Sequence, residues 1–105
     1  MAGSGSRDTG IRPPKSPCSS LRFRTVLNSP QANIIKTLQV GDELPLSVLP
    51  SPPSPVVATH NGVAAGTVTG SQVNALINCI MSGFQFVAAV IEVRGGQCIV
   101  DVHIK

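Results

Sequence analysis

The spacing of apolar and polar residues changes several times along the chain, and each spacing predicts a different element. Strand-like alternation or short apolar runs predict six strands, at residues 21–28, 43–49, 55–60, 63–69, 84–93 and 97–104. Between residues 70 and 83 the spacing is helical, because apolar side chains fall at i, i+3, i+4, i+7 and i+8: Val73, Leu76, Ile77, Ile80 and Met81. A shorter helix is predicted over residues 30–38, with its buried side at Ile34, Ile35 and Leu38.

Turn residues predict how the strands are joined. Asn61-Gly62 and Gly95-Gly96 each separate two β-rich runs, and both pairs tolerate positive φ, so two hairpins are expected. Pro45 lacks an amide donor, which predicts that the strand at 43–49 lies at a sheet edge or contains a bulge.

Residues that favour helix ends flank both predicted helices. The hydroxyl of Ser71 is expected to cap the longer helix, and Gly83 suits the left-handed residue that ends many helices. Ser29 is expected to cap the shorter helix, with Pro30 at its first position.

These elements predict one α+β domain over residues 20–105. The expected architecture is a small, mainly antiparallel barrel or sandwich of about six strands, with one main helix and one short helix. Residues 1–19 combine Gly, Ser, Pro and charge with a single bulky apolar residue, which predicts a disordered tail. The proline-rich residues 50–55 are expected to form a stiff loop.

Charge is scarce and unevenly placed. Only 12% of the residues are charged, the net charge is +3, and no Asp, Glu, Lys or Arg occurs from Leu44 to Ile91. The main helix therefore has a polar but uncharged outer side, formed by Gln72, Asn74, Asn78 and Ser82. Depletion of charge is typical of the centre of a protein interface. Two interpretations stay open: a partner protein covers this side, or the helix is threaded through its own barrel and buried all round.

The uncharged stretch from Val73 to Ile91 is also long enough to span a bilayer. Asn74, Asn78 and Gln85 would be costly in lipid, and the spacing changes from helical to alternating near Gly83. We therefore expect a helix followed by a strand in place of a membrane span, and no membrane is expected among the main partners.

Enzyme and metal chemistry have few candidate residues. Cys18, Cys79 and Cys98 are widely separated without a CxxC pattern, so no zinc site or other cofactor is expected. Asp101 and His103 are i and i+2 on one outward strand face, an arrangement common for solvated residues, and we expect no enzymatic activity. Cys79 and Cys98 are expected to be buried and unpaired in a reducing compartment, which with no apolar leader predicts a cytoplasmic protein.

Basic residues suggest a second kind of partner. A phosphate-binding patch would form if the barrel gathered four side chains: Arg22, Arg24, Lys36 and Arg94. The alternative is that these charges are scattered over the surface.

Residues 40–93 resemble a HIRAN domain in three segments: GDELPLSV, PVVATHNGVAAG and SQVNALINCIMSG. The resemblance implies a small β-barrel that binds DNA ends and occurs with helicases and nucleases. The Asn-Pro-x-Asp motif of the family is replaced by SPPSP, and its Gly-Tyr is Gly66-Thr67. Since those motifs carry the DNA contacts of the family, no DNA-binding residue is transferred to this chain.

The sequence thus predicts a non-catalytic binding or adaptor module that acts through a partner protein or through a second copy of itself. A HIRAN-like DNA-binding module is the alternative.

Overall fold

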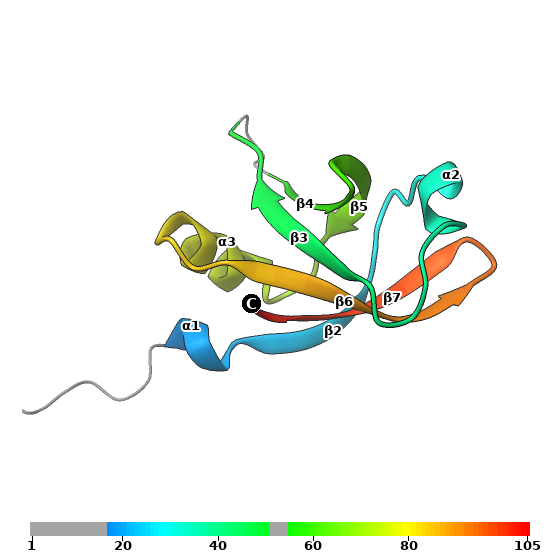
Figure 1. Cartoon of the computed structure of the whole chain (residues 1–105). Coiled ribbons are helices and arrows are strands. Elements are labelled where there is room, and N and C mark those ends of the chain that lie inside the picture. The colour runs from blue at the N-terminus through cyan, green and yellow to red at the C-terminus, as the bar shows by residue number, and fades with distance from the viewer. Residues whose placement is uncertain (1–16, 51–54) are drawn as a thin grey trace, which may run out of the picture.

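The computed structural model describes residues 17–50 and 55–105, and its central feature is one antiparallel sheet curled into a half-barrel (Figure 1). The sheet has six strands in the order β2-β7-β6-β3-β4-β5. Their bounds are β2 (Arg22–Val26), β3 (Glu43–Val48), β4 (Val56–His60), β5 (Val63–Val68), β6 (Phe86–Arg94) and β7 (Gln97–Ile104). The predicted α+β class with six strands is confirmed.

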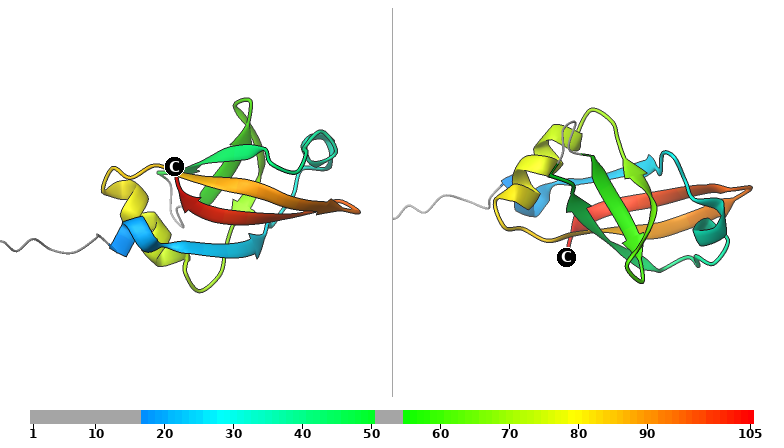
Figure 2. Two further views of the ribbon diagram at one scale, coloured as in Figure 1. Left: turned by 60° about the horizontal axis from the view of Figure 1, so that its bottom comes forward. Right: turned by 90° about the horizontal axis from the view of Figure 1, so that it is seen from above.

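Three helices accompany the sheet: α1 (Pro17–Ser20), α2 (Ala32–Ile35) and α3 (Val73–Met81). Helix α3 lies beside α1 at one end of the sheet, and the β6–β7 turn lies at the other end (Figure 2). Helix α2 is one turn of the longer helix predicted over 30–38. Helix α1 includes residues 17–19 of the segment predicted to be disordered, whereas residues 1–16 lie outside the described part of the chain.

Both predicted hairpins form at the expected dipeptides. Asn61 and Gly62 have φ of 53° and 82° between β4 and β5, and Gly95 and Gly96 have φ of 54° and 88° between β6 and β7. The register shifts by one residue in each hairpin, once between Ala58 and Thr59 and once in β6. Such bulges increase local twist and bending, which favours the curl of the sheet.

The predicted N-caps of both helices are wrong. The N-cap of α3 is Gln72 instead of Ser71, and its side chain makes no capping hydrogen bond. Ser29 has a positive φ of 49° because the chain turns there from a bridge with β5, so α2 begins after Gln31. Gly83 has φ of 102° just after α3, as predicted for the residue that follows a helix.

The two edges of the half-barrel meet just after β2. Asn28 N–H donates to Thr67 C=O at 2.8 Å, and Thr67 N–H donates to Asn28 C=O at 2.9 Å. A Cβ on Gly66 would lie 3.0 Å from the Asn28 carbonyl oxygen and 3.1 Å from the Leu27 Cβ. Glycine therefore permits the close approach that joins the segment after β2 to β5.

The core lies between the inner face of the curled sheet and α3. Its most completely buried large side chains include Ile35, Leu44, Val56, Leu76, Phe86, Val100 and Val102. In α3 the buried residues are Leu76 and Cys79, whereas Met81 is 73% exposed. The predicted buried side of the helix is therefore wrong at Met81, because the core contacts a narrower stripe than the apolar spacing implied.

A disulfide joins Cys18 of α1 to Cys79 of α3. The prediction that Cys79 is unpaired is wrong, whereas Cys98 is a buried free cysteine as predicted. The disulfide removes one reason for expecting a reducing compartment, since disulfides are rare in the cytosol. The cytoplasmic location stays a prediction.

Candidate functional site

The uncharged part of the sequence is gathered into one region of the molecule. From Leu44 onward it forms β3, β4, β5, α3 and the first residues of β6. The polar side chains on the outer side of α3 are all exposed: Gln72, Asn74, Asn78 and Ser82. The interpretation that α3 is threaded through the barrel and buried all round is therefore wrong. We call this exposed side, defined by those four residues, the α3 face.

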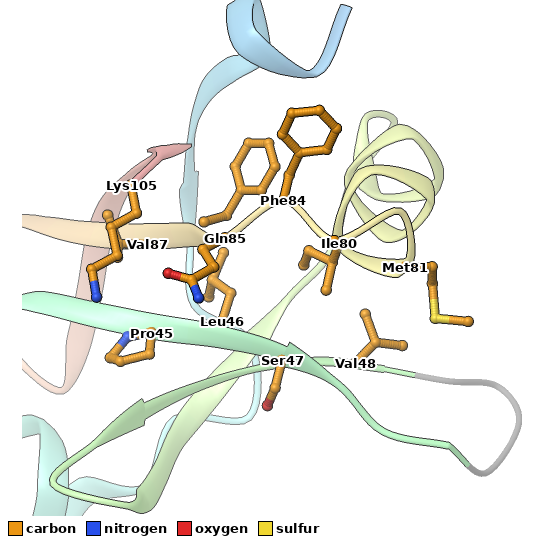
Figure 3. A pocket seen from close by; sticks show the side chains of 12 residues that line it. Pro45, Leu46, Ser47, Val48, Ile80, Met81, Phe84, Gln85, Val87 and Lys105 are labelled. Atoms are coloured by element: carbon orange, nitrogen blue, oxygen red, sulfur yellow. The ribbon is translucent and has the colours of Figure 1, made fainter. Parts of the chain in front are cut away.

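A cleft of about 540 Å³ adjoins the C-terminal end of α3 (Figure 3). It lies between β3 and the segment that leads from α3 into β6, and we call it the β3–β6 cleft. Its lining comprises Pro45, Leu46, Ser47, Val48, Ile80, Met81, Gly83, Phe84, Gln85, Phe86, Val87 and Lys105.

The cleft exists because β3 changes partner part-way along its length. Its first half pairs with β6, from Glu43↔Ala89 to Pro45↔Val87, and its second half pairs with β4 from Leu46 onward. Strands β3 and β6 therefore separate after Pro45. Pro45 lies in a central strand, so the prediction of a sheet edge is wrong; the position tolerates proline because β4 pairs only with the residues that follow it.

One end of the cleft is apolar and the other is polar. Figure 3 shows Val48, Ile80 and Met81 grouped at one end, whereas Gln85 and Lys105 lie at the other end near Pro45. Lys105 is held beside β6 by its amide, which donates to the Gln85 carbonyl at 2.8 Å. It is the single charged side chain in the lining, which includes no Asp or Glu.

The four basic residues expected to bind nucleic acid do not form one patch. Arg22 and Arg94 lie opposite His103 and Gln97 of β7, which places them about 20 Å apart along the strand. Arg24 lies two residues beyond Arg22 on β2, and Lys36 lies at the end of α2. The structure thus places Arg22 and Arg24 near each other and separates them from Arg94.

Two of these arginines already have carboxylate partners. The Nε and Nη2 atoms of Arg22 donate to Asp101 Oδ2 at 2.9 and 2.6 Å, and Arg94 pairs with Glu92. The hydrogen bond and negative charge of Asp101 raise the pKa of Arg22 above its usual value. Their charges are partly neutralised within the protein, which weakens their attraction for phosphate.

The remaining residues whose side chains could take part in catalysis are ion-paired, close to a backbone carbonyl or buried. Asp101 is only 8% exposed and accepts the Arg22 bonds, so the expectation that it is solvated is wrong. His103 Nδ1 lies 2.9 Å from the Ile104 carbonyl oxygen, and the Cys98 thiol is buried, which raises its pKa.

Within residues 17–50 and 55–105, no helix has the length and apolar composition needed to cross a bilayer.

Comparisons with known proteins found no matching family model, no matching curated protein and no matching solved structure. The HIRAN resemblance therefore stays a prediction. The sequence did not predict that Val48, Ile80, Gln85 and Lys105 line a common cleft. The cleft arises where β3 and β6 separate, and the position of that separation depends on the pairing register of the strands. Pro45 was the one local signal at that position.

Proposed function

We propose that this protein is a non-catalytic binding module that contacts a partner protein through the α3 face and the adjoining β3–β6 cleft. The observation that carries the proposal is an open, largely apolar cleft beside an exposed helix side without charge. A second copy of the chain is one partner of this kind.

Physical properties of the region support a protein partner. Interface centres are depleted of charged residues and enriched in methionine, and Met81 lies exposed where the α3 face meets the cleft. Asn and Gln side chains on the α3 face supply donors and acceptors whose desolvation is less costly than that of a charge. A partner that covers both features would bury apolar surface and form hydrogen bonds in one contact.

DNA binding is the alternative function. It would use Arg22, Arg24, Lys36 and Arg94, two of which have carboxylate partners. Binding of a labelled oligonucleotide that weakens with salt and is lost on charge reversal of these four residues would favour the alternative.

The proposal is tested by placing one charge on the α3 face. The tagged full chain and its Asn78→Lys variant are used to capture proteins from cells of the native source, and the captured proteins are quantified by mass spectrometry. Asn33→Lys is the matched control, because it makes the same change at an exposed position within another helix, α2. We expect a partner, or the chain itself, to be retained with the control and lost with Asn78→Lys. Equal capture with both variants would contradict the proposal.

A further inference from the structure

We propose that the β3–β6 cleft binds an extended peptide segment of the partner protein as an added strand beside β3. The segment would carry an apolar side chain for the end formed by Val48, Ile80 and Met81, and an acidic side chain for Lys105. This inference rests on the proposed protein-binding function and names the form of the ligand.

The backbone of β3 supports strand addition. Leu49 N–H donates to the Pro55 carbonyl at 3.0 Å, and the Pro45 carbonyl accepts from Thr59 Oγ1 at 3.5 Å, so these two residues point their polar groups toward β4. Hydrogen-bonding directions alternate along a strand, so the N–H and C=O of Val48 point to the opposite side. That side faces the cleft, and in the described chain the β3–β6 ladder has no pair beyond Pro45↔Val87.

The side chains of the cleft add selectivity to this backbone contact. In an added strand every second side chain projects to the same side, so a peptide with alternating apolar residues would direct one of them toward Ile80. Leu46 is 8% exposed and forms part of the floor of the cleft, whereas Met81 is exposed at its rim. A long apolar side chain would therefore bury surface that is now open to solvent.

Charge complementarity favours an acidic side chain at the end of the peptide that lies beside Lys105. The Lys105 side chain is exposed, and the cleft lining contains no Asp or Glu side chain. A carboxylate of the peptide would pair with the Lys105 ammonium group and accept from the Gln85 amide, whereas a basic side chain would be repelled. The occupant that these features favour is a strand with alternating apolar residues and one acidic residue.

The experiment uses a random dodecapeptide library displayed on phage and selected on the full chain. We expect enriched peptides to share alternating apolar residues and one acidic residue, and to shift the NMR signals of backbone amides at 46–48 and 85–87. N-methylation of a synthetic enriched peptide should weaken binding at every second position, because only alternate amides face β3. No enrichment, or N-methyl effects without this alternation, would overturn the proposal.

Variants of the protein separate the two ends of the cleft. Lys105→Glu should weaken binding of the acidic peptide about tenfold and strengthen binding of its Asp→Lys or Glu→Lys analogue, whereas Lys36→Glu should change neither. Val48→Pro removes the amide that faces the cleft but leaves the bonds of Ser47 and Leu49 to β4, so binding should fall without loss of the fold. Unchanged binding in both variants would overturn strand addition. If the Asn78→Lys capture result still holds, only this inference fails and the protein-binding function stands.

Discussion

Gly66 lies where the two edges of the half-barrel meet, and its lack of a side chain permits that contact. The Asn28 carbonyl and the Leu27 side chain occupy the space that a Cβ would need. Valine suits strands better than glycine, so local preference alone would favour its presence in β5. Because Leu27 and Asn28 lie so close to Gly66, glycine is favoured over valine at this position.

We therefore expect Gly66→Val to lower the free energy of unfolding by about 2 kcal/mol, because the added methyl groups would push the segment after β2 away from β5. Urea denaturation followed by circular dichroism measures the change. Ala64→Val is the matched control, since Ala64 is exposed on the same strand. Equal stability of the two variants would show that the edge contact contributes little.

Cys98 makes stability depend on pH in the alkaline range. Its pKa is raised by burial, so the folded protein keeps the thiol proton at a pH where the unfolded chain has lost it. This contribution is present in full below the unfolded pKa, about 8.5, and is lost as the pH rises through the folded pKa. The chain has no tyrosine to titrate in the same range.

Urea midpoints measured between pH 7 and pH 10 should fall with rising pH in the wild-type protein and fall less steeply in Cys98→Ala. The slope carries the test, because the variant also leaves a small cavity that lowers stability at every pH. Parallel slopes would contradict the assigned effect of the buried thiol.

At the scale of elements, α1 is a single turn that is held by its link to α3. The Cys18–Cys79 disulfide closes a loop of 61 residues in sequence, and the four residues of α1 include none that is buried. A short helix of this kind has little stability of its own. The disulfide therefore anchors the chain before β2 to the helix that carries the α3 face.

Cys18→Ser should lower the free energy of unfolding by about 2–4 kcal/mol, since a long loop of the unfolded chain is no longer restrained. Thermal unfolding with and without dithiothreitol measures this effect. The reductant should destabilise the wild-type protein to a similar extent and leave the variant unchanged. A variant as stable as the oxidised wild-type protein would contradict the anchoring role.

Elements whose signals are local were predicted well from the sequence. The Asn61-Gly62 and Gly95-Gly96 turns each need positive φ at both residues, so their sequences alone identify the hairpins. The capping predictions failed where distant contacts decide the backbone, as at Ser29, which follows the bridge between Asn28 and β5. The Cys18–Cys79 pairing likewise depends on two segments that only the fold brings together.

In the candidate site, too, the feature with a local signal could be predicted, and the feature that depends on distant segments could not. The uncharged outer side of α3 could be predicted, because helical spacing places Asn74 and Asn78 together and their exposure agrees with it. The cleft could not, because it arises from the change of partner along β3 after Pro45. Register between strands is a property of the whole sheet.

At the scale of the whole molecule, charge is divided between two regions. The described residues between Leu44 and Ile91 form an uncharged region that includes the α3 face and all of the cleft lining except Lys105. The ion pairs Arg22–Asp101 and Arg94–Glu92 lie on β2, β6 and β7. This division gives the molecule one surface suited to covering by a partner protein and another suited to solvent. We propose that a partner protein covers the uncharged surface.

Site-specific photo-crosslinking would capture a protein that covers this surface. Benzoylphenylalanine is placed at Asn78 or, as the control, at Asn33 in the full chain, and cells of the native source are irradiated. We expect a discrete protein adduct, with a partner or with a second copy, at Asn78 and not at Asn33. Adducts of equal yield at both positions, or none at Asn78, would contradict it.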